Sequence, residues 1–401
     1  MNLASKLDRL RAQPGECADA ALAVRLKRSR VGVPEPAKAN TAAPVLGQAL
    51  AADRQLGELL ICEREVRLPP GDVGASDLVQ LPEVCELHTP DWVYIDTETT
   101  GLSSGVGNLA FMVGVARHVG DELLRVRQYV LGSFAAETRM LHDLVDWIGR
   151  DAVLVSFNGK CFDLPLLVAR CRLRRIDDGF AGLGHLDLMY TLRRAFRRRW
   201  PDCRLQTAER RLLNLHRQGD LPGAQAPVAW QRWLCNGETA LLAAVLQHNH
   251  QDVVSLALLQ RQLVIEYAGR GDPTADRTTI GRAWRDVGQA DLARRIWEGA
   301  GKRLDGDGQL ELAALYRRRG DWSRAESLWL ALHARGNAKA ASELSKYYEH
   351  RRRDFGRAID FAGHCDRSER DSRLRRLHGK VAATPQLPLW TTAGALNRGT
   401  Q

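Results

Sequence analysis

The chain has 401 residues, of which 44% are hydrophobic, and it carries a formal net charge of +10. This length exceeds one ordinary domain and suffices for two or three. A positive balance suits a polyanionic partner such as nucleic acid, and also an acidic membrane surface. No apolar run approaches the length of a membrane span, and the first residues lack a signal-peptide core. We therefore expect a cytoplasmic protein that does not bind membranes.

The eight cysteines form no CxxC pair and follow no regular spacing. This distribution argues against a zinc site and against a disulfide framework, and it favours reduced thiols.

Residues 1–54 are expected to form a short basic helix followed by a flexible linker rich in Pro and Ala. Residues 55–90 form a lead-in segment. This segment contains a strand-like run, LLICEREVRL, and then Pro-Gly turns. The sequence assigns it no function.

Residues 91–268 show the pattern of a mixed α/β domain. Strands are expected at WVYIDTE (92–98), LAFMVGVARHV (109–119), LLRVRQYVLG (123–132) and AVLVSFN (152–158), with a helix at 135–148. This order predicts a sheet that starts antiparallel and continues through a helical crossover. The pattern is mainly helical from there to about residue 267.

Residues 276–365 contain an internal repeat. GQADLARRIW (288–297) matches GDWSRAESLW (320–329), and RDFGRAIDFA (353–362) matches again. A period of about 32 residues predicts stacked helical pairs that resemble tetratricopeptide repeats. They form either a capping helical bundle or a surface for a protein partner. Residues 380–401 are expected to be an extended tail.

Two acidic residues close the first strand of the α/β domain. Asp96 and Glu98 are two positions apart, so their side chains point to the same face of a strand. Neighbouring anions repel one another unless a cation lies between them, and oxygen ligands suit Mg²⁺ or Mn²⁺.

A third carboxylate lies in the apolar segment FNGKCFDLPLL. Asp163 is costly to bury there unless it is paired or metal-bound. The alternative is a helix N-cap, because Pro165 fits an early helical position. Asn158 ends the preceding strand and is a candidate to bind a chain end or to brace the loop.

The fourth carboxylate lies on a predicted helix, LLAAVLQHNHQDVVSLALL. Val245, Asn249, Asp252, Leu256 and Leu259 share one stripe, which is expected to be buried. His248 is one turn before Asp252, where an imidazole can take a proton from an attacking water. A packed structural histidine is the alternative, and His250 points elsewhere on the helix.

The order and separation of these three segments resemble the three motifs of the DEDD 3′–5′ exonucleases, which have a ribonuclease-H-like fold. More narrowly, the chain resembles the YprB-type ribonuclease-H-like family. The resemblance also covers HLDLMYTLRRAF (185–196), residues 205–209, DLPG (220–223) and HNHQD (248–252). It spans residues 88–268, less than half of the chain.

The resemblance implies that Asp96, Glu98, Asp163 and Asp252 hold two metal ions about 4 Å apart, with His248 as the general base. The spacing of His248 departs from the histidine-bearing subgroup, in which the base stands five residues before the last aspartate; position 247 here is Gln. The family also implies that Thr100 and Leu102 border the terminal nucleotide.

An arginine-rich stretch follows within the same domain. Residues 193–217 contain nine arginines and two acidic residues, with Phe196 and Trp200 between them. We expect Arg197, Arg198 and Arg199 to bind single-stranded nucleic acid, with the aromatic rings stacking on bases. The alternative is a solvated helix face whose aromatic residues enter the core. Asp187 is expected to be a helix N-cap rather than a support of the acid cluster.

Three functions fit these features. The first is a metal-dependent 3′–5′ exonuclease that acts on single-stranded DNA or RNA ends. The second is a nucleic-acid-binding scaffold with weak or no activity. The third is a structure-selective endonuclease on the same fold. The presence of all four acids favours the first.

Overall fold

The computed structural model describes residues 42–88, 90–101, 107–180, 182–217, 219, 221 and 223–383. The predicted basic helix, most of the predicted linker, Leu102 and the tail beyond residue 383 lie outside these residues. Within the predicted linker, the chain forms helix α3 (Ala42–Ala49). Leu46 on this helix and Leu50 after it are buried in the main hydrophobic core, which fixes the helix against the rest of the unit.

The chain divides into two compact units that alternate along the sequence. The first comprises the described parts of residues 1–69, 91–185 and 217–256, and the second those of 70–90, 186–216 and 257–401. The sequence predicts domains that are consecutive segments of the chain, and that division remains a prediction.

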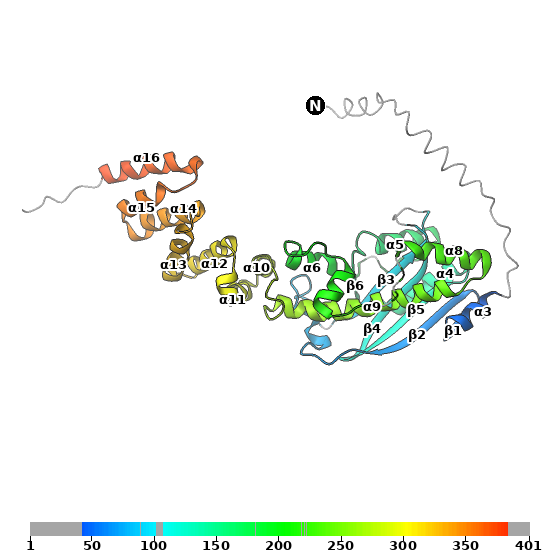
Figure 1. Cartoon of the computed structure of the whole chain (residues 1–401). Helices are drawn as coiled ribbons and strands as arrows, with labels where there is room; N and C mark the ends of the chain where they lie inside the picture. Colours follow the sequence, from blue (N-terminus) through cyan, green and yellow to red (C-terminus); the bar gives the residue numbers. More distant parts are fainter. Residues whose placement is uncertain are drawn as a thin grey trace, which may run out of the picture. The chain divides into compact units, whose positions relative to one another are not determined.

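A seven-stranded mixed sheet forms the centre of the first unit (Figure 1). Its order is β1-β2-β5-β4-β3-β6-β7. Neighbours from β1 to β3 are antiparallel, and β3 is parallel to β6. The predicted antiparallel start and helical crossover are therefore confirmed, as is the mixed-sheet fold class. The strands are β1 (Arg54–Leu56), β2 (Leu59–Arg67), β3 (Asp91–Thr99), β4 (Ala110–Gly120), β5 (Leu123–Leu131), β6 (Ala152–Ser156) and β7 (Gly184–Asp187).

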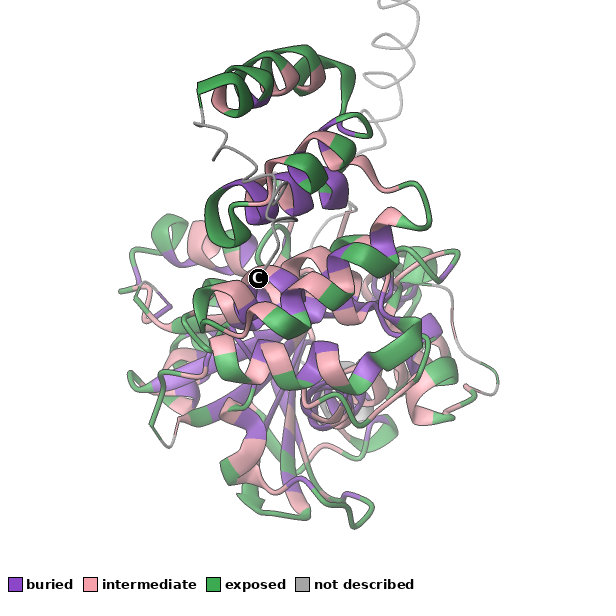
Figure 2. Ribbon diagram, turned by 90° about the vertical axis from the view of Figure 1, so that its left-hand side faces the viewer, coloured by how far each residue is buried: buried purple, intermediate pink, exposed green. Residues whose placement is uncertain are grey.

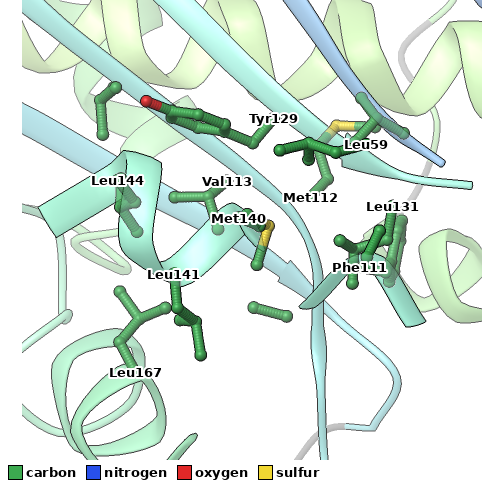
Figure 3. Close-up of a cluster of buried hydrophobic side chains, with 14 of the residues drawn as sticks. Leu59, Phe111, Met112, Val113, Tyr129, Leu131, Met140, Leu141, Leu144 and Leu167 are labelled. Atoms are coloured by element: carbon green, nitrogen blue, oxygen red, sulfur yellow. The ribbon is translucent and has the colours of Figure 1, made fainter. Parts of the chain in front are cut away.

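Helices bury both faces of this sheet. Val113 and Tyr129 point to the face where Met140, Leu141 and Leu144 of one helix pack (Figure 3). Helix α9 crosses the strands on the opposite face (Figure 1). The helices of this layer arrangement are α4 (Glu137–Ile148), α5 (Asp163–Leu173), α8 (Ala226–Asn236) and the long α9 (Ala240–Tyr267), whose end belongs to the second unit.

The second unit is helical. It contains a 3-10 helix at Ala75–Val79, then α6 (Leu188–Phe196), α7 (Leu205–Ala208) and a π-helix at Glu209–Leu213. The described repeat region then contains α10 (Arg277–Asp286), α11 (Ala290–Ala300), α12 (Gly306–Arg318), α13 (Trp322–His333), α14 (Ala338–Tyr347), α15 (Phe355–Ala362) and α16 (Arg367–Ala383), with a π-helix at Tyr348–Arg352.

The internal repeat produces the predicted helical pairs. The aligned residues Ala293, Ala325 and Ala358 are completely buried, because each packs between the helices of its pair. Equivalent turns place Gly288 and Gly320 at φ 82° and 79°, in the left-handed region that favours glycine. Figure 2 shows such helices with buried residues on one side and exposed residues on the other. The all-α repeat region is therefore confirmed, whereas its tetratricopeptide character remains a prediction.

The seven cysteines within the described residues are free. Among the helices described, none combines the length and the apolar character of a membrane span.

Candidate active site

The site begins with a row of three residues across neighbouring strands. Asp96 on β3 faces Gly114 on β4, which faces Gln128 on β5. Residues directly opposite in a sheet share a face, so this row lies under α9. Glu98 follows on the same face and is 8% exposed. The alternation predicted for the acidic strand therefore brings both carboxylates to the side that α9 covers.

Asn249 of α9 connects this row. The Gln128 amide donates a hydrogen bond to Asn249 Oδ1 at 2.9 Å and another to the Leu246 carbonyl oxygen at 2.8 Å. The Asn249 amide in turn donates to Asp96 Oδ2 at 2.9 Å. A Cβ on Gly114 would stand 2.2 Å from Asn249 Oδ1, so only glycine leaves room for this contact. The packing of helix on sheet thus orients one carboxylate.

Asp163 enters the site from the start of α5. Phe162 occupies the capping position and Asp163 is the first helical residue, so the alternative interpretation of Asp163 as the N-cap is wrong. The Thr97 hydroxyl on β3 donates to Asp163 Oδ1. Gly159 passes close by, since a Cβ there would lie 3.1 Å from Asp163 Oδ2. These contacts bring Asp163 to the end of the acidic strand.

Asn158 shapes the turn before α5. It has φ 69°, a left-handed conformation that asparagine tolerates, and its carbonyl oxygen accepts from the Cys161 amide at 3.2 Å. Its backbone therefore braces the loop. Its role in substrate binding remains a prediction.

Asp252 and His248 lie together on α9, as their spacing predicts. His248 Nε2 is 3.5 Å from Asp252 Oδ2. The Arg217 guanidinium forms an ion pair with Asp252 Oδ1 and lies 3.2 Å from His248 Nδ1. All three side chains are at least 85% buried. With an N–H of Arg217 directed at Nδ1, His248 carries its proton on Nε2, facing Asp252; this tautomer is inferred from the contacts.

The charges of the four acids act on one another. Burial raises the pKa of the Asp96 carboxyl well above its usual range, and the charges of Asp252, Asp163 and Glu98 raise it further. The hydrogen bond from Asn249 opposes this rise. Carboxylates distant in sequence therefore act on the charge of Asp96, and their repulsion favours a cation nearby.

His250, the competing histidine, has a different environment. Burial and the charge of Arg64 lower its pKa. Arg64 lies on β2, which β5 and β4 separate from β3 in the sheet. His250 therefore belongs to another part of the helix surface.

The donor set fits hard divalent cations, although the ligand atoms are not assembled for one. Among the described residues, no three His, Cys, Asp or Glu side chains gather closely enough to hold a metal ion. Oxygens of Asp96, Asp163 and Asp252 are bonded instead to Asn249, Thr97 and Arg217, respectively. Four mutually repelling carboxylates are the ligands that Mg²⁺ and Mn²⁺ prefer. Binding would require part of these bonds to open.

The other predicted site residues have varied positions. Thr100 exchanges two hydrogen bonds with Leu109, of 2.9 and 3.0 Å, and so closes the loop after the acidic strand. Leu102 lies outside the described residues. Asp187 is the N-cap of α6 and accepts from the Met189 amide at 3.1 Å, which confirms its predicted capping role.

The arginine-rich stretch matches its prediction only in part. Arg197, Arg198 and Arg199 are exposed after the end of α6, in the second unit. Phe196 and Trp200 are buried and stack on each other at 4.2 Å, so the expected stacking on bases is wrong. The apolar rings enter the core because that removes more surface from water. Phosphate binding by the three arginines remains a prediction.

Sequence reasoning missed three participants. Arg217 was grouped with a general basic stretch, and no spacing rule connects it to Asp252, 35 residues later. Gln128 carries no motif. Asn249 was assigned to the buried stripe without a partner; a polar residue on a buried stripe was the available signal, because it must find a hydrogen bond there.

Three comparisons show which known proteins this chain resembles. A family model described as the RNase_H superfamily matches residues 93–264. The uncharacterized protein YprB of Bacillus subtilis (strain 168) is 30% identical over 283 residues, which make up 67% of this chain and 67% of that protein. A solved family B DNA polymerase from the archaeon Pyrobaculum calidifontis is similar over 57% of this chain and 29% of its own length, with a TM-score of 0.37 and 14% identity. The chain belongs to the family of YprB-type ribonuclease-H-like proteins.

Proposed function

We propose that this protein is a metal-dependent 3′–5′ exonuclease that hydrolyses phosphodiester bonds at single-stranded nucleic-acid ends. The main support is the environment of Asp96: burial raises the pKa of its carboxyl, and the charges of Asp252, Asp163 and Glu98 raise it further. Strongly perturbed groups that cluster in this way are typical of functional sites. The 3′–5′ direction follows from the resemblance to the DEDD exonucleases.

In this proposal the four carboxylates are the metal ligands, with Asp96 held in place by Asn249. Divalent ions bound there would supply polarisation of the phosphodiester and a more acidic water. His248 is proposed to take the proton from that water, since it lies one turn from Asp252. Thr100, Leu102 and Asn158 are proposed to border the terminal nucleotide, and Arg197, Arg198 and Arg199 to hold the strand by its phosphates.

The decisive experiment is digestion of DNA and RNA strands labelled at either end, with Mg²⁺, with Mn²⁺ and with a chelator. We expect stepwise shortening from the 3′ end that depends on the metal and stops when the 3′ end is blocked. Cleavage of the blocked strand would instead indicate an endonuclease. Binding without cleavage under every metal condition would indicate a scaffold and would refute the proposal.

A further inference from the structure

Arg217 lies where a cation is expected in the acid cluster. It sits in a segment without helix or strand, yet its side chain is only 10% exposed. Its guanidinium contacts both Asp252 Oδ1 and His248 Nδ1. A guanidinium is always protonated and buries well only against carboxylates or similar acceptors. One positive charge of the chain itself therefore pairs with Asp252, one of the four proposed metal-binding carboxylates.

This contact engages atoms that the proposed reaction needs. Asp252 Oδ1 is a ligand atom in the proposed site, and an oxygen that holds a guanidinium is not free to bind an ion in the same place. His248 Nδ1 accepts from the same group. Metal ligands must be deprotonated and accessible, so an ion that binds at Asp252 competes with this ion pair.

We propose that Arg217 is a resident counter-cation of the acid cluster, which a divalent ion displaces from Asp252 and which then binds a phosphate of the incoming strand. This inference rests on the proposed nuclease function. The exchange conserves favourable charge pairing at each stage, because a planar guanidinium binds carboxylate and phosphate oxygens with the same two-pronged geometry. The ion pair of Arg217 with Asp252 makes metal binding weak without substrate. A phosphate that binds Arg217 would then strengthen metal binding.

Binding of Mn²⁺ to the full chain tests the first step, measured by calorimetry and by the electron paramagnetic resonance signal of the free ion. We expect Arg217→Gln to bind Mn²⁺ about three- to tenfold more tightly than the unaltered protein, since it removes the competing charge. Arg232→Gln is the matched control: it removes an exposed arginine paired with Glu238 at 3.6 Å, and we expect no change. Asp96→Asn should bind Mn²⁺ still more weakly than the unaltered protein, because it loses a proposed ligand.

Fluorescence anisotropy of a short labelled oligothymidine in Ca²⁺ tests the second step. Arg217→Gln should weaken strand binding about tenfold, while Arg232→Gln leaves it nearly unchanged. Equal or weaker Mn²⁺ binding by Arg217→Gln would show that Arg217 merely positions Asp252 and would overturn the inference. Unchanged strand binding would overturn the phosphate step. If the unaltered protein and Asp96→Asn bind Mn²⁺ alike, the proposed function itself fails, which is a separate result.

Discussion

Two carboxylates, the buried Glu349 of the helical repeats and the partly buried Asp96 of the sheet, have opposite environments. Burial would raise the pKa of Glu349 in the helical repeats, but hydrogen bonds and charges from Lys380 and Arg376, each at 2.7 Å, hold it below its usual range. For Asp96 in the sheet, burial raises the pKa, and three further carboxylates raise it again. Neighbouring bases compensate the negative charge of Glu349, whereas burial and neighbouring acids destabilise the negative charge of Asp96.

The difference is the one expected between a structural carboxylate and the proposed functional one. A buried acid with two basic partners joins helices, because removing either side leaves an uncompensated charge. A buried acid among other acids contributes nothing to folding and persists only where it serves a ligand or a reaction. The same physical terms, burial and neighbouring charge, therefore indicate fold maintenance in the repeats and chemistry in the sheet.

Asp96→Asn should give the largest effect. We expect hydrolysis of a 3′-labelled strand in Mg²⁺ to fall about a thousandfold or more, because a metal ligand is lost. The free energy of unfolding in urea should stay equal or rise by about 1 kcal/mol, since one of four repelling charges is removed. An active Asp96→Asn protein would contradict the assignment of this acid.

Glu349→Gln should show the reverse pattern. We expect the second unit to lose about 2 kcal/mol of stability, because Arg376 and Lys380 lose their buried acceptor; both bases are partly exposed, which limits the cost. Activity per folded molecule should not change. Asp291→Asn is the control, since both partners of its ion pair with Arg319 are about half exposed, and it should cost far less stability than Glu349→Gln. Equal losses in the two variants would argue against a buried structural role.

Two glycine substitutions sharpen the comparison. A Cβ on Gly114 would meet Asn249 Oδ1 at 2.2 Å, and one on Gly281 in the repeats would meet Trp297 Nε1 at 2.1 Å. Alanine at either position should cost about 1–3 kcal/mol through overpacking, measured by urea unfolding. Only Gly114→Ala should also reduce activity per folded molecule, because it displaces the residue that orients Asp96. A matching loss of activity in Gly281→Ala would show that the two regions are not separable in this way.

Charge reversal of Arg197, Arg198 and Arg199 to Glu should give the smallest effect. We expect binding of single-stranded DNA to weaken about tenfold, with a shallower dependence on salt concentration, because fewer counterions are released. Stability should fall as well, because Arg198→Glu replaces the basic partner of Asp276 and Asp305, at 3.6 and 3.9 Å, with a like charge. Reversal of Arg351, Arg352 and Arg353 in the repeats changes net charge equally and serves as the control. If both triple variants bind single-stranded DNA equally weakly, the loss reflects overall charge and not a specific site.

The sequence by itself determined the local features. The two-residue spacing of Asp96 and Glu98 brought both to one face of β3, and the stripe on α9 turned Asn249 inward. The repeat in the second unit predicted stacked helical pairs, and the aligned alanines are buried at the same position of each pair. These features follow from the periods of strand and helix, which can be recognised within a single segment of the sequence.

Only the tertiary structure decided which side chains meet. Arg217 reaches Asp252 from a segment without regular structure, and Gln128 reaches Asn249 from a strand more than a hundred residues earlier. The burial of Phe196 and Trp200, which reversed the expected stacking on bases, also depended on partners from elsewhere in the chain. The physical reason is that hydrogen bonds, ion pairs and burial depend on distance in space, which the periodicity of a local segment does not encode.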